Sequence, residues 1–221
     1  MFSFYRHEMK SNTIGIPKEI KNNENRVALV PSAAYALIQH GHKVVVQRDA
    51  GDGASYGDQE YEQAGATLVE TAEEVFGAAD LIVKVKEPQP SEIALLTPRH
   101  TLFTYLHLAA SKELTQTLLA TGCTAIAYET IEVNGRLPLL EPMSEIAGRM
   151  SVLVGAYHLA EHRGGRGILL GGVPGVLPGK VVIIGGGTAG VNAARVATGI
   201  GADVTILEVD LERMRFLDIT M

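Results

Sequence analysis

The chain has 221 residues, enough for one large domain or two small ones, and its 46% hydrophobic and 20% charged residues are typical of a folded protein. A net charge of −6 argues against a nucleic-acid surface or one that binds anionic membranes, and no apolar run approaches the ~20 residues of a membrane span. The single cysteine excludes a disulfide framework within the chain, and 24 glycines with few aromatic residues favour a soluble, cytoplasmic α/β protein.

The first twelve residues, MFSFYRHEMKSN, have no apolar stretch long enough for a signal peptide. We expect residues 1–12 to form a disordered extension. Met9 stands just before the first strand-like segment and is an alternative start of translation.

Short apolar, β-branched segments then alternate with helical patterns. The helical segments carry recognisable ends: Gly41 after the first, Asp58 as the expected N-cap of the second, and the capping-box pair Thr71 and Glu74 at the third. Strands are predicted at residues 13–16, 43–47, 67–69, 81–85, 101–106 and 124–128. One helix between successive strands indicates parallel crossovers, so we predict a doubly wound α/β domain with a flavodoxin-like parallel sheet.

The pattern changes after residue 137, where two prolines precede a long amphipathic helix at 143–161. Gly148 and Gly155 lie inside this helix, which suggests that another backbone passes close to it. A glycine-rich segment follows at 164–179. We therefore place a domain boundary near residues 135–145. The expected parts are a substrate domain at 13–140, a linking helix at 141–163 and a partial nucleotide-binding domain at 164–221.

The last part contains a dinucleotide-binding fingerprint. A predicted strand at residues 180–184 is followed directly by GGGTAG, in which Gly185, Gly187 and Gly190 satisfy G-x-G-x-x-G, and then by an alanine-rich helix. Gly185 would permit the tight turn, Gly187 the approach of a pyrophosphate, and Gly190 the close packing of helix on strand. Thr188 opens the helix, whose N-terminus favours phosphate. The alternative is a tight turn in an ordinary βαβ unit.

An acidic residue stands where a ribose-binding group is expected. Glu208 follows the next predicted strand at residues 203–207, about twenty residues after the glycines, and can accept hydrogen bonds from ribose hydroxyls. A carboxylate there would repel a 2′-phosphate, so NAD is favoured over NADP. Arg213 could reach the adenosine end of the nucleotide and weakens this preference.

Three basic residues follow predicted strands of the first domain. Arg26, Lys86 and His107 would lie at the carboxyl ends of strands, where doubly wound sheets bind ligands. Each also has a structural explanation: Arg26 could pair with Glu19 or Glu24, Lys86 could be a solvated charge, and His107 a buried structural histidine. The remaining histidines are expected at the surface or at helix ends, and the acidic residues do not show the spacing of metal ligands, so no metal is expected.

Several long strings resemble the alanine dehydrogenase family, which includes the NAD-binding part of proton-translocating transhydrogenase. The resemblance runs from about residue 13 to 217, and two features, the sequence around His107 and PMSEIAGRM, are more similar to alanine dehydrogenase than to transhydrogenase. The strings are IPKEIKNNENRVAL, AGDGASYGD, VKVKEP, TLFTYLHLAA, AIAYET, LPLLEPMSEIAGRM, GGRGILLGGVPGV and VIIGGGTAGVNAARVA.

The resemblance implies a reaction: L-alanine, NAD and water give pyruvate, ammonium and NADH, reversibly, in an enzyme that is typically a homo-oligomer. It implies that Arg26 and Lys86 bind the substrate carboxylate and carbonyl and that His107 is the general acid–base. The resemblance further implies that Lys86 takes part in catalysis. Met143 and Ser144 match positions that line the nicotinamide and substrate pocket of the family.

The chain departs from the family in length, because a Rossmann fold needs two βαβαβ halves and only the start of the first is present. We expect a C-terminally truncated enzyme with weak or no activity alone. The alternatives are a non-catalytic nucleotide-binding or interaction module and the soluble subunit of a transhydrogenase.

Overall fold

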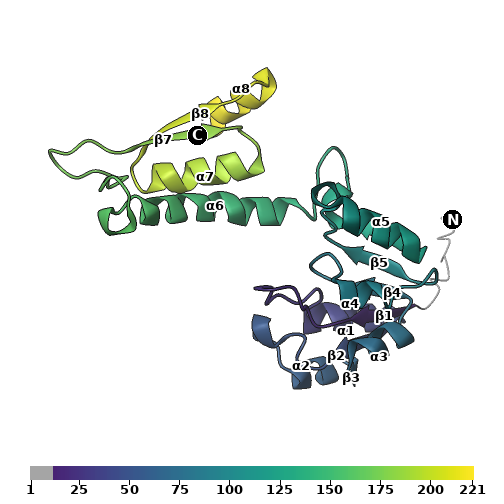
Figure 1. Cartoon of the computed structure of the whole chain (residues 1–221). Coiled ribbons are helices and arrows are strands. Elements are labelled where there is room, and N and C mark those ends of the chain that lie inside the picture. The colour runs from purple at the N-terminus through teal and green to yellow at the C-terminus, as the bar shows by residue number, and fades with distance from the viewer. Residues whose placement is uncertain (1–11) are drawn as a thin grey trace, which may run out of the picture. The chain divides into compact units, whose positions relative to one another are not determined.

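The computed structural model describes residues 12–221. Its contacts divide the chain into two compact units, one ending at Thr130 and the other spanning Ile131–Met221 (Figure 1). The boundary expected from the sequence lies a few residues beyond this division. The expected N-terminal extension lies, up to residue 11, outside the described residues.

The first unit is built on one parallel sheet of six strands in the order β3-β2-β1-β4-β5-β6. Every neighbouring pair is parallel, so the chain crosses over the sheet between strands, as the alternation of strands and helices predicts. The strands are β1 (Thr13–Ile16), β2 (Lys43–Gln47), β3 (Thr67–Val69), β4 (Leu81–Val83), β5 (Thr101–Thr104) and β6 (Thr124–Ala127). The α-helices are α1 (Pro31–Gln39), α2 (Asp58–Gln63), α3 (Ala72–Ala78), α4 (Pro90–Ile93) and α5 (Lys112–Thr121).

This order confirms the α/β prediction but differs from the flavodoxin-like order, because two strands rather than one lie beyond β1. It is the order of the dinucleotide-binding folds. The strand order reverses between β1 and β4, which lie side by side. Loops at the carboxyl ends of these two strands therefore lie at the position, called the crevice below, where such sheets bind ligands.

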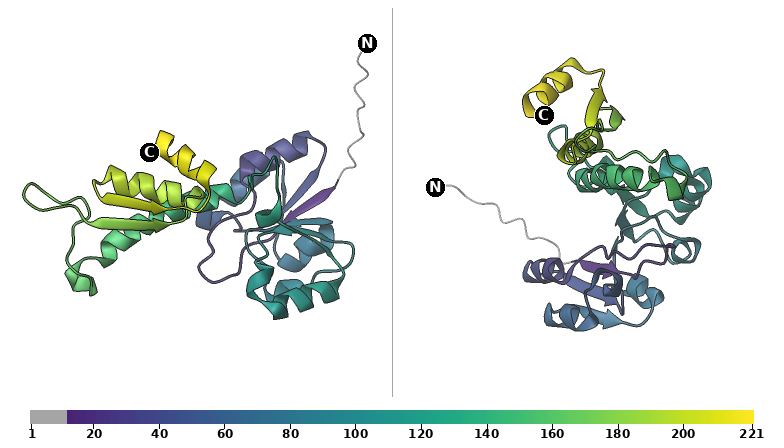
Figure 2. Two further views of the ribbon diagram at one scale, coloured as in Figure 1. Left: turned by 90° about the horizontal axis from the view of Figure 1, so that it is seen from above. Right: turned by 90° about the vertical axis from the view of Figure 1, so that its left-hand side faces the viewer.

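The sheet is buried on both faces, as its short apolar strands predict. Val44 and Val46 of β2 pack with α1 and α2 in one core cluster, whereas Val45 between them packs with α3 in the other. Successive side chains of a strand point to opposite faces, so the two clusters lie on the two sides of the sheet. The helices on both sides are visible in Figures 1 and 2.

The helix cap predicted at Thr71 is observed, whereas the one predicted at Asp58 is not. Thr71 accepts a hydrogen bond from the Glu74 N–H and Glu74 returns one to the Thr71 N–H, which confirms the capping box. The N-cap of α2 is Gly57, and Asp58 is the first helical residue. The Asp58 carboxylate binds Arg48 and the N–H of Asp49 instead, and these partners stabilise the turn after β2.

The second unit contains two parallel strands and three α-helices. Helix α6 (Glu141–His158) is followed by β7 (Lys180–Ile184), α7 (Thr188–Gly199), β8 (Asp203–Leu207) and α8 (Leu211–Thr220). Asp210 caps α8 by accepting a hydrogen bond from the Arg213 N–H.

Gly148 confirms the expectation that another backbone passes close to α6. A Cβ on Gly148 would lie 2.1 Å from the Ala189 carbonyl oxygen of α7. The same expectation is wrong for Gly155, where a Cβ would meet no atom within 4 Å. The absence of a side chain at Gly148 therefore lets α6 and α7 pack with their backbones in contact.

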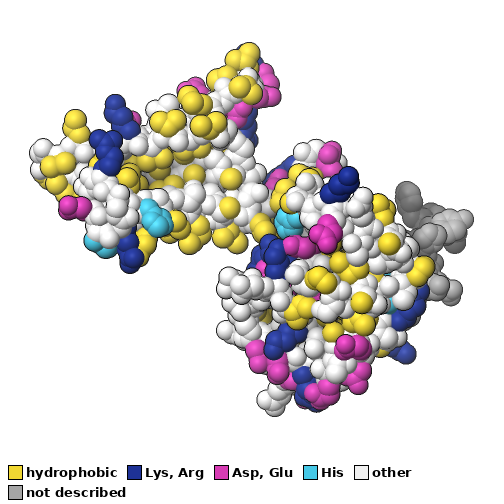
Figure 3. Space-filling view, viewed as in Figure 1, with side chains coloured by type: hydrophobic (Ala, Val, Ile, Leu, Met, Phe, Trp, Pro, Cys, Tyr) yellow, Lys and Arg dark blue, Asp and Glu magenta, His cyan; other side chains and the backbone are white. Residues whose placement is uncertain are grey.

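One face of the β7–β8 sheet packs on α6 and α7, and the other is exposed. Ile183 and Ala194 belong to the core of this unit, whereas Val182 and Ile184 of β7 and Leu207 of β8 are exposed. Apolar side chains gather on the visible surface of this unit (Figure 3). Among residues 12–221, no helix is both long enough and apolar enough to cross a membrane.

Candidate functional site

A buried ion-pair network lies at the crevice between β1 and β4. Lys84 follows β4 and is fully buried, and its Nζ lies 3.1 Å from Glu19 Oε2 and 2.6 Å from Glu92 Oε1. Glu19 comes from the loop after β1, and Glu92 from α4. Burial raises the pKa of Glu19, and the charge of Lys84 and the N–H of Val85 act in the opposite direction. One lysine thus holds together the segments that follow β1 and β4.

Lys86 is held by its backbone next to this network. Its N–H points to Glu19 Oε1 at 3.4 Å, and its carbonyl accepts a hydrogen bond of 2.8 Å from the Thr104 hydroxyl on β5. Its charge contributes to a lowered pKa of Glu24, a change that arises first from the hydrogen bond of Arg26 to the same carboxylate. The backbone of Lys86 thus lies between Glu19 and Thr104, and its charge acts on Glu24.

Arg26 forms the ion pair that its surroundings in the sequence suggest. Its guanidinium donates to both oxygens of Glu24, at 2.8 and 2.6 Å. The side chain remains 48% exposed, so a ligand can reach it. The pKa of Arg26 is raised, first by the hydrogen bond to Glu24, and the charges of Tyr105 and Glu19 add to the effect.

His107 has an unusual backbone conformation just after β5. It is in the left-handed region with φ of 51°, which is uncommon for a residue other than glycine. Its N–H donates to Glu129 Oε1 at 2.7 Å, and the N–H of Leu106 donates to the same carboxylate. On the ring, Nδ1 lies 3.4 Å from Glu87 Oε2. The loop thus presents the ring beside an acidic group, with 42% of the side chain exposed.

The three basic residues predicted from the sequence lie in one region and share neighbours. Arg26 and Lys86 both act on Glu24, while Tyr105 is close to Arg26 and has its ring centroid 6.1 Å from that of His107. The ion pair of Arg26 with Glu24 is thus observed, and the convergence of the three basic residues on one ligand stays a prediction.

Sequence reasoning missed the residues that hold this region in place. They are acidic or buried basic side chains whose partners are distant in sequence: Glu19, Lys84, Glu87, Glu92 and Glu129. The only sequence signal for any of them was the position of a carboxylate directly after a predicted strand, as for Glu129 after residues 124–128. His100, expected at the surface, is buried and bonds to Thr97 and to the Phe76 carbonyl.

The glycine-rich turn of the second unit has the geometry of a phosphate-binding loop. Gly185 is left-handed with φ of 98°, and a Cβ on Gly190 would lie 1.9 Å from the Gly185 carbonyl oxygen. A Cβ on Gly187 would meet nothing within 4 Å, so the turn is open to solvent at that residue. Gly187 is also the N-cap of α7, whose first N–H groups are directed toward this opening. The residues present therefore fit a nucleotide pyrophosphate.

Glu208 and Arg213 stabilise the same turn. Glu208 accepts from the Gly186 N–H at 2.7 Å and from the N–H groups of Val209 and Asp210. Hydrogen bonds from these N–H groups lower the pKa of Glu208. Arg213 donates to the Gly186 carbonyl at 2.6 Å. Both side chains thus lie beside the turn, where they bind its backbone in place of the nucleotide that the sequence predicts as their partner.

Ser144 and Thr188 line a shared cavity of about 220 Å³ in the second unit. Arg136 and Glu141, which form an ion pair at 2.6 Å, line it as well. Met143 is the preceding residue of α6, and its N–H donates to the Leu140 carbonyl. The expected cofactor-binding residues 143, 144 and 188 thus come from the N-terminal ends of α6 and α7.

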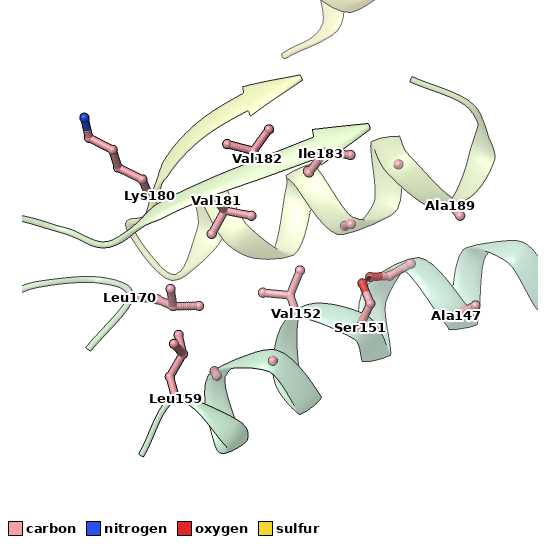
Figure 4. Close-up of a pocket in the computed structure, with 15 residues that line it drawn as sticks. Ala147, Ser151, Val152, Leu159, Leu170, Lys180, Val181, Val182, Ile183 and Ala189 are labelled. Atoms are coloured by element: carbon pink, nitrogen blue, oxygen red, sulfur yellow. Dashed lines mark hydrogen bonds between the residues drawn. The ribbon is translucent and has the colours of Figure 1, made fainter. Parts of the chain in front are cut away.

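A second cavity of this unit, of about 670 Å³, lies between α6, α7 and the edge of β7 (Figure 4). Its lining is mainly apolar, with Val152 and Leu159 on one side and Val181 and Ile183 on the other. It contains none of the predicted site residues except Gly190. In the described part of the chain, no group of three or more His, Cys, Asp or Glu residues could hold a metal ion.

Two glycine substitutions separate packing from ligand access in the turn. We expect Gly187→Ala to fold with a loss of stability below about 1 kcal/mol, because its Cβ enters open space, and to weaken NADH binding at least about 10-fold. Gly190→Ala, in contrast, should lose stability through packing, because its Cβ would clash with the Gly185 carbonyl oxygen. NADH fluorescence titration and urea unfolding measure the two effects. Unchanged NADH affinity in Gly187→Ala would contradict the assignment.

Comparisons with known proteins cover almost the whole chain. Residues 15–147 match the family described as "Alanine dehydrogenase/PNT, N-terminal domain", and residues 151–221 match its C-terminal domain. The chain is 54% identical over 206 residues to the alanine dehydrogenase of Mycolicibacterium smegmatis and 55% identical over 207 residues to that of Geobacillus stearothermophilus.

Solved structures agree with these sequence matches. An L-alanine dehydrogenase structure superimposes with a TM-score of 0.86 and 54% identity, and the transhydrogenase from Sinorhizobium meliloti with a TM-score of 0.78 and 27% identity. These alignments cover 94% of this chain and 57% and 59% of the two structures. The match to M. smegmatis covers 93% of this chain and 56% of that relative, so the chain spans about half the length of the proteins it matches. The chain belongs to the alanine dehydrogenase/PNT family.

Proposed function

We propose that the protein is an NAD-dependent alanine dehydrogenase. The reaction converts L-alanine, NAD⁺ and water into pyruvate, ammonium, NADH and a proton, and it runs in both directions. The observation that carries the proposal is the cluster of Arg26, Lys86 and His107 at the crevice of the first sheet. The cluster occurs in a chain that is more than half identical to alanine dehydrogenases.

The basic residues suit a small 2-oxo or 2-amino acid. The planar guanidinium of Arg26 can bind a carboxylate through two parallel hydrogen bonds, and it remains exposed beside Glu24. Lys86 supplies a point charge that can bind the C2 oxygen of pyruvate and polarise that carbonyl. We assign the two residues to orientation and charge stabilisation of the substrate.

His107 provides the proton transfers that the reaction needs. After the hydride has left C2 of alanine, Nε2 accepts a proton from the water that adds to C2 of the resulting imine, and it returns a proton to the departing amine. A histidine suits both transfers, because its ordinary pKa is close to neutral pH. Bound NAD supplies the acceptor for the hydride that leaves C2 of alanine.

The turn of the second unit supports a nucleotide with two phosphates. Gly187 offers an open backbone, Thr188 a hydroxyl at the start of α7, and the helix N-terminus a partial positive charge. We infer NAD rather than NADP, because Glu208 places a carboxylate beside the turn and would repel a 2′-phosphate. Glu208 would exchange its bond to the Gly186 N–H for a ribose hydroxyl when the nucleotide binds.

The test is reduction of NAD by the purified protein in the presence of L-alanine, with pyruvate and ammonium supplied for the reverse direction. From the 221-residue chain, which spans about half the length of its relatives, we expect at most weak turnover in both directions and at least about 10-fold lower kcat/KM with NADP. Hydride exchange between two nucleotides without alanine would instead indicate a transhydrogenase. Nucleotide binding without either reaction would contradict the proposal and indicate a binding module.

Two further parts of the proposal concern the whole enzyme. We propose that the protein acts in the cytoplasm and assembles as a homo-oligomer. The first part is supported by the composition of the chain and the second by its resemblance to the family.

A further inference from the structure

We propose that Glu87 is a positioning residue that orients the His107 imidazole through Nδ1 and leaves Nε2 available for proton transfer. The inference deepens the proposed function and rests on it only for the catalytic consequence. The contact itself is a property of the described structure: Glu87 Oε2 lies 3.4 Å from His107 Nδ1.

The oxygen that faces His107 is buried and has no other donor. Among residues 12–221, Oε2 of Glu87 forms no hydrogen bond, although it is shielded from solvent. A buried carboxylate oxygen without a donor is costly, so a donor within reach is strongly favoured. The Nδ1–H tautomer of His107 supplies that donor. Catalytic hydrogen bonds are often long in free enzymes and shorten when the substrate binds.

The other oxygen of Glu87 fixes the carboxylate and its charge. Oε1 forms an ion pair with Lys21, from the loop after β1. Burial acts to raise the pKa of Glu87, but the hydrogen bond from Lys21, a backbone hydrogen bond and the charge of Lys21 outweigh it, and the net pKa is lowered. Glu87 is therefore an ionised acceptor, and an ionised acceptor favours a proton on the facing ring nitrogen.

The backbone on both sides of this contact is firmly held. Glu87 precedes Pro88, and its carbonyl accepts from the Gln89 side chain at 3.0 Å. On the other side, Glu129 binds the N–H of His107 and keeps it in the left-handed conformation. Neither residue can easily move away, so the orientation of the ring is set before a substrate arrives.

The decisive experiment measures the tautomer of His107 directly. With ¹⁵N-labelled protein, we expect the neutral His107 ring to carry its proton on Nδ1 in the wild type and to shift toward the Nε2–H tautomer in Glu87→Gln. The matched control is Glu70→Gln, which removes an exposed carboxylate paired with Arg48 elsewhere in the same unit. An identical tautomer in the wild type and Glu87→Gln would overturn the proposal.

Kinetics provides the second measurement. We expect Glu87→Gln to lower kcat by about 10-fold to 100-fold, part of the ~10²–10⁴ that a positioned acid–base group contributes, with little change in KM for L-alanine. Glu87→Asp, which keeps the charge, should recover part of the rate. A rise in KM with unchanged kcat would assign Glu87 to substrate binding. If the wild type does not oxidise alanine, the proposed function fails, while the tautomer measurement still decides the role of Glu87.

Discussion

Replacing His107 with alanine should lower kcat for L-alanine oxidation by about 10³-fold, within the range for the loss of a general acid–base group. The exposed ring lies at the crevice beside Glu87, and the loop that carries it is held by Glu129 through the backbone. Alanine keeps those backbone bonds, so the fold should survive. NADH fluorescence titration should show unchanged nucleotide affinity, because the glycine-rich turn is in the other unit.

The matched control is His162→Ala, which removes an exposed histidine of the second unit and should leave turnover unchanged. Equal losses of turnover and NADH affinity in His107→Ala would show that His107 maintains structure. Full activity in that variant would remove it from the mechanism and contradict the proton-transfer role.

Replacing Lys84 with methionine should lower the free energy of unfolding by about 3–5 kcal/mol, because it leaves buried carboxylates without their cation. Glu19 and Glu92 both bind Lys84 Nζ, and neither can reach solvent without moving the loops after β1 and β4. Urea unfolding measures the loss. Lys43→Met, at an exposed position of β2, should change stability by no more than about 0.5 kcal/mol.

The loss in Lys84→Met should depend on pH in a defined direction. Burial already raises the pKa of Glu19, and removing the lysine that opposes this shift raises it further. A carboxyl whose pKa is raised in the folded state stabilises the fold at pH values below its ordinary pKa. This stabilisation is lost as the pH rises through the folded-state pKa. The deficit relative to wild type should therefore be smaller at about pH 5 than at about pH 8. A deficit that grows toward acid would contradict this account of the network.

The positions of strands and helices could be predicted because they depend on local pattern. The segments 43–47, 180–184 and 203–207 are observed with those bounds, and the caps at Thr71 and Asp210 follow local hydrogen-bonding rules. The order of the strands across the sheet, in contrast, does not depend on local sequence pattern. Nothing in the sequences of β2 and β3 specifies which side of β1 these strands occupy. The order of the strands in the first sheet is therefore known only from the structure.

The chemistry of the crevice was partly predictable for a similar reason. Arg26, Lys86 and His107 stand after predicted strands and could be placed at one edge of the sheet. The residues that hold them could not be placed, because Glu19 binds Lys84 across 65 positions of sequence and Glu129 binds His107 across 22. Asp58 shows the same limit, since distant Arg48 and the turn after β2 recruit a carboxylate that local rules assign to a helix cap.

The ion pair between Glu19 and Lys84 also has a consequence for how the site is acquired during folding. Its two residues belong to the two halves of the first sheet, which meet only where β1 pairs with β4. Such non-local parallel pairing is slow, since a long loop must close before the contact forms. Neither half alone can assemble the loop that carries Lys86. We therefore expect the contacts around Lys86 to form late in folding, after the helices and strands of each half have become ordered.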